Sequence, residues 1–201
     1  MWYMTERMEE AGAARIGKDK CMRELALHIL DIVQNSVAAG AGTVTITVDE
    51  DMGADRLTFS IADDGRGMDQ ETVAKVTDPF YTTRTTRKVG LGLPLLKETS
   101  TACNGSFAID SQVGVGTTVT AMYQHSHIDR PPLGDMVSTM ITILLGNEDI
   151  NIRYNHQKDS LSFSFESRDM KEALEGLSFQ NPDVYQWLNE FLAEGEQSLG
   201  S

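Results

Sequence analysis

The sequence predicts an α/β (α+β) two-layer sandwich, a mixed sheet with helices on one face, followed by a small C-terminal α/β appendage. Residues 23–39 have the apolar spacing of an amphipathic helix, and segments 43–48 and 57–62 alternate as half-buried strands. A second helix at 90–101 is followed by two more strands within 106–123. Helices and strands that follow one another in this way indicate an α/β or α+β fold.

The first helix, RELALHILDIVQNSVAA, has two faces and ends at the stop signal Gly40-Ala41-Gly42. Its apolar face repeats at helical spacing through Leu25, Ile29, Ile32, Val33 and Val37. A polar stripe with the same spacing contains Glu24, His28, Asp31 and Asn35. Such a stripe is usually the solvated side of a helix, and His28 is expected to be a surface side chain.

The two strands that follow, 43–48 and 57–62, are joined by the polar turn DEDMGAD and predict a hairpin. Asp69 can cap a short helix over 70–76. Residues 77–89 have no hydrophobic period and are expected to form a long, mobile loop.

The helix at 90–101 contains Pro94, which is tolerated only in a first turn. Strands at 106–110 and 117–123 follow, joined by the turn Gly114-Val115-Gly116.

The chain divides by composition into five predicted segments. Asp129-Arg130-Pro131-Pro132 marks a linker, and helix and strand signals resume beyond it. The predicted segments are a flexible leader at 1–21, a domain at 22–125, a linker at 126–132, a small α/β domain at 133–195 and a frayed tail at 196–201.

Charge and composition exclude several classes of function. A net charge of −13 with a pI near 4.6 lacks the basic footprint that nucleic acids or anionic membrane surfaces require. The longest apolar segment, 136–145, is too short to cross a bilayer. Cys21 and Cys103 form neither a disulfide framework nor a metal spacing, which fits a cytoplasmic location.

Asp63, Gly65 and Gly67 form the pattern D-x-G-x-G where the second strand ends. Glycines there let the backbone turn sharply and approach a flat ligand, and a carboxylate can accept a hydrogen bond from an exocyclic amine such as that of adenine. Alone the pattern is weak, because Asp and Gly are common in ordinary turns.

Val89-Gly90-Leu91-Gly92-Leu93 opens a helix directly after a basic loop. Free backbone amides at a helix N-terminus favour anions, and Arg84, Arg87 and Lys88 could add charge-assisted contacts to phosphates. The alternative is a glycine-rich hinge with solvated basic residues. Gly116-Thr117-Thr118 at the start of the last strand could be an ordinary strand start, or could place a hydroxyl near Asp63.

The order of these motifs resembles the GHKL ATPase superfamily, which includes gyrase, the heat-shock chaperone, histidine kinases and mismatch-repair ATPases. The resemblance covers roughly residues 22–123 and is closest to the ATP-binding domain of histidine kinases, because DPFYTTR at 78–84 is similar to their phenylalanine motif. It implies the Bergerat-type ATP-binding fold, with ATP and Mg²⁺ as cofactors.

The same resemblance assigns the site. It implies that Asn35 chelates Mg²⁺, that Asp63 contacts the adenine amine, that residues 77–89 form a lid, and that Asp31 stands where relatives carry a glutamate base. Aspartate is one methylene shorter, which limits its reach. The other nucleotide-binding residues implied are Gly65, Gly67, Met68, Phe80, Arg84, Arg87, Lys88, Gly90, Leu91, Gly92, Leu93 and Thr117.

Two functions follow from the resemblance. One is a Mg-ATP-binding signalling protein that hydrolyses ATP or transfers its γ-phosphate to a partner protein. The other is a non-hydrolysing, ATP/ADP-responsive module that regulates a partner complex. Short stand-alone proteins of this type, encoded near hydrogenase and NADH-dehydrogenase-like subunits in anaerobic bacteria, imply a redox-complex subunit as one candidate partner. A structural role without nucleotide is the third alternative.

A phosphoacceptor domain would precede the first helix in a histidine kinase, and only about twenty residues do so here. HIDRPP at 127–132 matches the spacing H-x-x-R-x-P found around acceptor histidines. It follows the ATP-binding segment, and its prolines favour a linker, so we interpret the match as coincidence.

Overall fold

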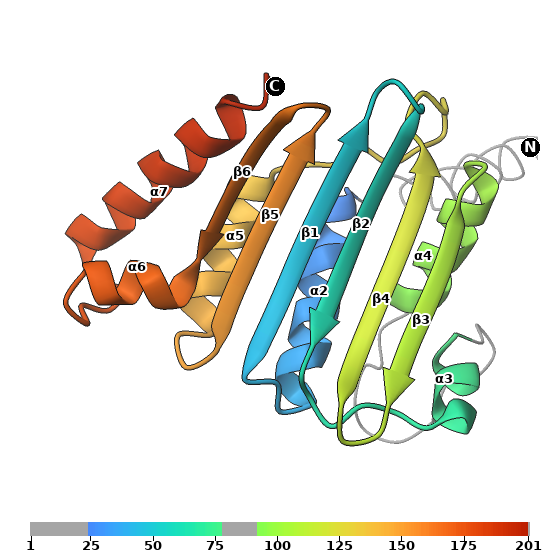
Figure 1. Ribbon diagram of the computed structural model, residues 1–201, viewed down its shortest axis with the longest axis horizontal. Coiled ribbons are helices and arrows are strands. Elements are labelled where there is room, and N and C mark those ends of the chain that lie inside the picture. The colour runs from blue at the N-terminus through green and yellow to red at the C-terminus, as the bar shows by residue number, and fades with distance from the viewer. Residues whose placement is uncertain (1–23, 78–91, 201) are drawn as a thin grey trace, which may run out of the picture.

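The protein folds around one six-stranded mixed sheet, described here from a computed structural model that covers residues 24–77 and 92–200 (Figure 1). The strand order is β3-β4-β2-β1-β5-β6. The predicted leader at 1–21 and most of the predicted lid lie outside the described residues. The strands are β1 (Thr43–Asp51), β2 (Arg56–Asp63), β3 (Ser106–Gln112), β4 (Gly116–Gln124), β5 (Asn151–Lys158) and β6 (Leu161–Glu166).

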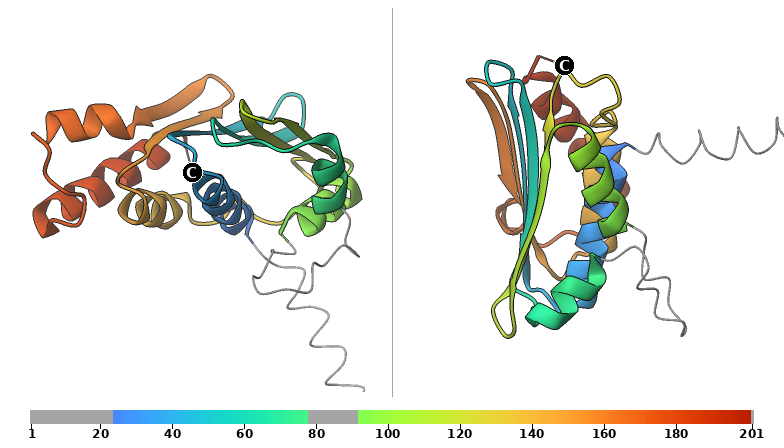
Figure 2. Two further views of the ribbon diagram at one scale, coloured as in Figure 1. Left: turned by 90° about the horizontal axis from the view of Figure 1, so that it is seen from below. Right: turned by 90° about the vertical axis from the view of Figure 1, so that its right-hand side faces the viewer.

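The helices α2, α4 and α5 form a second layer on one face of the sheet, and the other face is open (Figure 2). This confirms the predicted two-layer α/β architecture. The helices are α2 (Leu25–Ala38), α3 (Gln70–Val76), α4 (Gly92–Ala102), α5 (Met136–Gly146), α6 (Ser167–Ala173) and α7 (Pro182–Gln197). No described helix has both the length and the apolar character needed to span a membrane.

The core lies between α2 and the sheet, as the apolar periodicities predict. Leu25, Ile29, Ile32 and Val33 of α2 are at most 5% exposed, and they pack over alternate residues of the central strands. Because side chains alternate across a strand, one face of β1 and β2 is fully buried. The strand residues concerned are Val44, Ile46, Val48, Leu57, Phe59 and Ile61.

His28 departs from the surface position expected for the polar stripe of α2. Its side chain is only 3% exposed, whereas Asp31 and Asn35, further along the same helix, are exposed. Both α4 and α5 pack along α2, so a position that looks solvated from the helix alone can be covered by helices that come later in the chain.

The C-terminal segment, predicted as a small α/β domain of its own at 133–195, has helices and strands but no sheet of its own. Its strand β5 pairs in parallel with β1, with Thr43 opposite Asn151, and β6 continues the same sheet. The segment 131–134 also caps α2, because the N–H groups of Leu25 and Ala26 donate to the carbonyls of Pro132 and Leu133 at 2.9 and 2.8 Å. Residues 126–132 therefore connect two parts of one layered unit.

The tail predicted to be frayed at 196–201 is ordered as far as the described residues extend. Glu196 lies inside α7, and Leu199 is 1% exposed. The Tyr154 hydroxyl donates to the Glu196 carboxylate at 2.6 Å, and His156 contacts it at 2.9 Å. These partners lie on β5, about forty residues earlier, and could not be seen in the tail's own composition.

A buried ionic cluster joins β1, β5 and α7 at the end of the sheet where β1 finishes. His156, 2% exposed, lies between Glu50 at 3.2 Å and Glu196 at 2.9 Å, and His125 contacts Glu50 at 3.0 Å. Burial opposes protonation of His156, but its hydrogen bonds to Glu196 and Glu50 prevail and raise its pKa to about 9. The hydrogen bond from His156 in turn lowers the pKa of Glu50 to about 2.

Candidate functional site

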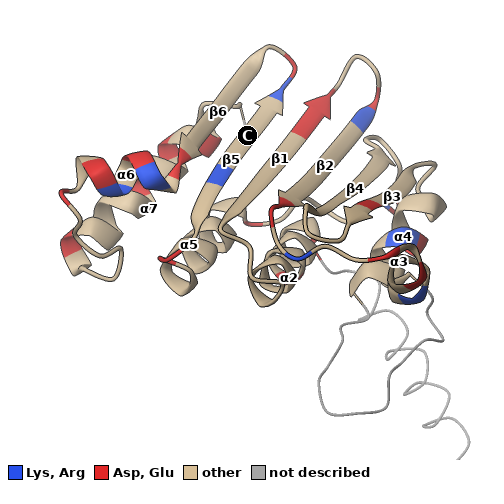
Figure 3. Cartoon of the chain, turned by 60° about the horizontal axis from the view of Figure 1, so that its bottom comes forward, with Lys and Arg blue, Asp and Glu red and all other residues tan. Residues whose placement is uncertain are grey.

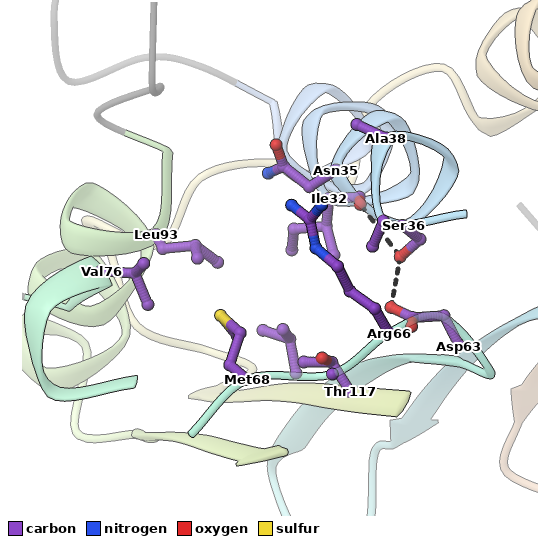
Figure 4. Close-up of a pocket in the computed structure, with 13 residues that line it drawn as sticks. Ile32, Asn35, Ser36, Ala38, Asp63, Arg66, Met68, Val76, Leu93 and Thr117 are labelled. Atoms are coloured by element: carbon purple, nitrogen blue, oxygen red, sulfur yellow. Dashed lines mark hydrogen bonds between the residues drawn. The ribbon is translucent and has the colours of Figure 1, made fainter. Parts of the chain in front are cut away.

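A cavity of about 220 Å³ lies at the opposite end of the sheet, between α2, the loop after β2, and α4 (Figure 4). Its wall is largely apolar, and polar side chains from separate elements reach it, among them Asn35, Asp63 and Thr117. The remaining lining residues are Ile32, Ser36, Ala38, Ala39, Arg66, Gly67, Met68, Val76, Leu93 and Val119.

Asp63 ends β2 and its carboxylate is held by two hydrogen bonds. Oδ2 accepts from the Ser36 hydroxyl of α2 at 2.7 Å, and Oδ1 accepts from the Gly65 N–H at 2.9 Å. The register places Asp63 opposite Thr117 on β4. A carboxylate fixed from two sides in an otherwise apolar wall is a pre-oriented hydrogen-bond acceptor.

The two glycines that frame Asp63 are required by close backbone approaches. Gly67 has φ +64°, and a Cβ atom there would lie 1.9 Å from the Gln112 carbonyl oxygen. Gly116 has φ +138°, and its Cβ would lie 1.9 Å from the carbonyl oxygen of Asp63. No side chain fits at either position, so the loop and the β3–β4 turn pack directly against each other.

Asp64, which the sequence analysis did not single out, fixes the other side of this loop. Its Oδ1 accepts from the N–H groups of Gly42 at 2.7 Å and Thr43 at 2.8 Å, where the chain leaves α2 and enters β1. These hydrogen bonds, that of Thr43 foremost, lower the pKa of the Asp64 carboxyl. The residue therefore locks the end of β2 to the start of β1.

Ser111 supports the wall from β3. It accepts from the Met68 N–H at 2.8 Å, donates to the Gly116 carbonyl at 3.1 Å, and its hydroxyl lies 2.8 Å from that of Thr117. Met68 and Thr117 are thereby placed on one side of the cavity, facing α2 (Figure 4).

Six predicted nucleotide-binding residues line this cavity, although they are spread over more than eighty positions of sequence: Asn35, Asp63, Gly67, Met68, Leu93 and Thr117. Gly65 lies beside it as the donor to Asp63. Six further predicted site residues, Phe80, Arg84, Arg87, Lys88, Gly90 and Leu91, lie outside the described residues.

Asp31, the predicted base, is exposed and does not line the cavity. It lies one turn before Asn35 on α2 and beside the start of α4, where a Cβ on Gly92 would lie 3.5 Å from Asp31 Oδ2. The Asn35 side chain points to the cavity mouth, and within the described part of the chain it has no hydrogen-bond partner.

Ser36 and Arg66 are site residues that sequence reasoning missed. Ser36 is 3% exposed and looks like a core position of α2, yet its hydroxyl orients Asp63. Arg66 is the variable residue of D-x-G-x-G, and its exposed side chain extends across the cavity towards Asn35 (Figure 4). The available signals were a polar residue directly after Asn35 and a cation between the two glycines of D-x-G-x-G.

His127, which matches the acceptor spacing, lies at the far end of β4 from the cavity. Thr117 lines the cavity at the start of β4, and Gln124 ends that strand seven residues later, about 23 Å away at the rise of a strand. His127 Nδ1 accepts from the N–H of Asp129 at 3.2 Å in a local turn. Its position does not favour phosphotransfer from the cavity within one molecule.

Comparison with curated proteins gives similarity to bacterial sensor kinases over about half of the chain. A 110-residue segment is 36% identical to the sensor histidine kinase WalK of Bacillus subtilis, covering 52% of this chain and 18% of that protein. A 125-residue segment is 30% identical to the non-motile and phage-resistance protein of Caulobacter vibrioides, covering 59% of this chain and 15% of that protein. The matched segment is thus less than a fifth of the length of either relative.

Two solved structures show partial overlap. ShkA, solved at full length in complex with AMPPNP, gives a TM-score of 0.40 at 26% identity, covering 48% of this chain and 20% of ShkA. The MutL ATPase domain of Aquifex aeolicus, complexed with ADP, gives a TM-score of 0.46 at 16% identity, covering 80% of this chain and 68% of the MutL domain.

The sequence profile described as histidine kinase-, DNA gyrase B-, and HSP90-like ATPase matches residues 22–126. This range is just over half of the 201 residues and includes every described residue of the cavity wall. The chain therefore belongs to the histidine kinase-, DNA gyrase B- and HSP90-like ATPase family.

Proposed function

We propose that the cavity binds Mg-ATP and that the protein acts in regulation or signalling by hydrolysing ATP or transferring its γ-phosphate to a partner protein. The observation that carries this proposal is the Asp63 carboxylate, held by Ser36 and Gly65 in an apolar wall. An adenine ring would lie among Ile32, Met68 and Val119 and donate its amine to Asp63. Membership of the histidine kinase-, DNA gyrase B- and HSP90-like ATPase family supports this ligand class.

The residues near the cavity mouth fit a magnesium ion held mainly by the nucleotide. Mg²⁺ usually keeps several waters and takes one or two protein oxygens together with substrate phosphates. Asn35 is exposed there, so its amide oxygen would hold the ion, which would supply charge neutralisation to the phosphates.

Asp31 would accept the proton of an attacking water or hydroxyl. It lies on the same helix one turn from Asn35 and beside the N-terminal end of α4, so the base and the phosphate-binding amides would be adjacent. We place the protein in the cytoplasm, with a still unidentified partner protein that could be a redox-complex subunit.

The experiment that tests the proposed chemistry measures the fate of γ-labelled ATP with Mg²⁺. We expect Asp31→Ala to lower phosphate release or transfer by about 100-fold, the lower end of typical general-base contributions. ATP affinity should change little, because Asp31 does not line the cavity. Asp149→Ala, which removes another exposed carboxylate, is the matched control and should react as the wild type does.

The exposed position of Asp31 outside the cavity wall also favours the second candidate, a nucleotide-responsive module without turnover. Mg²⁺-dependent ATP binding in the wild type with no phosphate release or transfer would establish that function and reject the first. Failure to bind ATP or ADP would reject both.

Ser36→Ala tests the support of Asp63 separately. Loss of one hydrogen bond to a carboxylate costs about 1 kcal/mol, so the Kd for ATP should rise about fivefold as measured by calorimetry. Ser106→Ala, at an exposed position of β3, should leave the Kd unchanged. An unchanged Kd in Ser36→Ala would show that Asp63 needs no support from α2.

A further inference from the structure

The strand β6 ends the sheet without the features that usually protect an edge. It pairs only with β5 among the described strands. Its first five residues, LSFSF, contain no charge and no proline, whereas native edges commonly carry Lys, Pro or a bulge. The opposite edge, β3, has Asp110 within the strand and contacts α3 and α4.

The outward backbone groups of β6 can be assigned from its pairing with β5. The Ile152 N–H of β5 donates to the Ser167 hydroxyl just beyond β6, so even-numbered residues of β5 direct their N–H groups towards β6. Their opposite residues, Phe163 and Phe165, face back towards β5. Because the direction alternates along a strand, the N–H and C=O groups of Ser162 and Ser164 point away from the sheet.

Helix α7 extends beyond this edge, as Figure 1 shows, and lies in the layer below the sheet (Figure 2). Phe191 lies under β6, with ring centroids 5.5 Å from Phe163 and 6.1 Å from Phe165. Trp187, one turn earlier, stacks on Phe191 at 5.4 Å and is 40% exposed. Strands in a sheet lie about 4.8 Å apart, so one additional strand beside β6 would lie near α7. Trp187 offers an apolar surface on which the side chains of this strand can pack.

The charge of α7 indicates which kind of strand would bind beside it. Within residues 182–197, α7 carries Asp183, Glu190 and Glu194 in addition to Glu196 of the ionic cluster, but no Lys or Arg (Figure 3). The neighbouring α6 is balanced, with two residues of each sign. A second copy of this chain would bring an equally acidic α7 to the edge, whereas a basic segment would be complementary.

We propose that the free edge of β6 and the face of α7 around Trp187 bind an extended, Lys- or Arg-bearing segment of a partner protein as a seventh strand. Main-chain hydrogen bonds to Ser162 and Ser164 provide the pairing, and alternate apolar side chains cover Trp187. Basic side chains of the segment lie near the carboxylates of α7.

The probe is a dye-labelled peptide of about nine residues that alternates Val and Lys, matched in length to an edge strand. Its affinity for the full chain is measured by fluorescence anisotropy and compared with that of a Val–Glu peptide. We expect the Val–Lys peptide to bind, more weakly at high salt, and the Val–Glu peptide not to bind. Trp187→Ala should weaken binding about tenfold or more, the usual loss at an aromatic anchor.

Tyr185→Ala is the matched control, because Tyr185 is similarly exposed but lies about 200° around α7 from Trp187. It should bind the peptide as the wild type does. Ser164→Pro removes one outward N–H and should abolish binding, and thermal unfolding shows whether this variant still folds. If Ser164→Pro does not fold, the result for Trp187→Ala decides the question.

Three results would overturn the proposal: no binding of the Val–Lys peptide, equal binding of both peptides, or unchanged affinity in Trp187→Ala. Concentration-dependent dimerisation that Trp187→Ala abolishes would assign the edge to a second copy and would overturn it as well.

Discussion

Replacing Asp63 by alanine is expected to weaken ATP binding by about 100-fold, with much less effect on the fold. Hydrogen bonds to charged groups contribute about 1.5–3 kcal/mol, and the variant also releases the Gly65 N–H that the carboxylate now fixes. Isothermal calorimetry with ATP and Mg²⁺ measures the change in Kd directly. Thermal unfolding without nucleotide separates it from a loss of structure.

Asp110→Ala is the matched control, since it removes an exposed carboxylate from β3 and should leave the affinity unchanged. GTP gives an independent check. Guanine presents a carbonyl where adenine presents an amine, so the Asp63 carboxylate should disfavour GTP in the wild type. Equal affinity of the wild type for ATP and GTP would contradict the assigned role of Asp63.

Replacing His156 by alanine is expected to destabilise the protein by about 3 kcal/mol. Removing His156 takes away the cation that the carboxylates of Glu50 and Glu196 share inside the cluster. For a chain of this size, 3 kcal/mol corresponds to roughly 6–12 °C in Tm. Denaturant unfolding measures the free-energy difference, and His127→Ala, which changes a histidine of a local turn outside the ionic cluster, should unfold as the wild type does.

The pH dependence of stability follows from the same residue. Because the pKa of His156 is raised to about 9 in the folded protein, its contribution is complete below its unfolded value near 6.5 and is lost as the pH rises through 9. Glu50, with a pKa of about 2, contributes above its unfolded value and loses this contribution as the pH falls through 2.

We therefore expect the free energy of unfolding of the wild type to fall by about 3 kcal/mol between pH 6.5 and 9.5. In His156→Ala this fall should be largely absent, while His127→Ala should retain it. A wild-type stability that does not change over this range would contradict the raised pKa.

The fold could be predicted to the extent that it is encoded in local periodicity. The buried face of α2, the β1–β2 hairpin and the Asp69-capped helix α3 all follow from spacing and capping residues, and the structure confirms them. The capping bond is present, since Asp69 accepts from the Thr72 N–H at 2.8 Å. Pro94 indeed lies in the first turn of α4.

The remaining features depend on contacts between distant segments, which carry no local signal. The burial of His28, the pairing of β5 with β1 and the anchoring of Glu196 each require a partner far away in sequence. In the site, the glycine patterns identified Asp63 and Gly67, but the role of Ser36 became visible only when α2 was placed against the end of β2.

The parallel pairing of β1 and β5 has a consequence for synthesis on the ribosome. The edge of β1 that starts at Thr43 keeps its backbone N–H and C=O groups unpaired until Asn151, more than a hundred positions later, has been synthesised. Parallel contacts at such separation form late, and an uncovered edge favours association with other nascent chains. The family segment alone, residues 22–126, would emerge with this edge of β1 unpaired, so we expect the C-terminal strands to protect it from other chains once they are made.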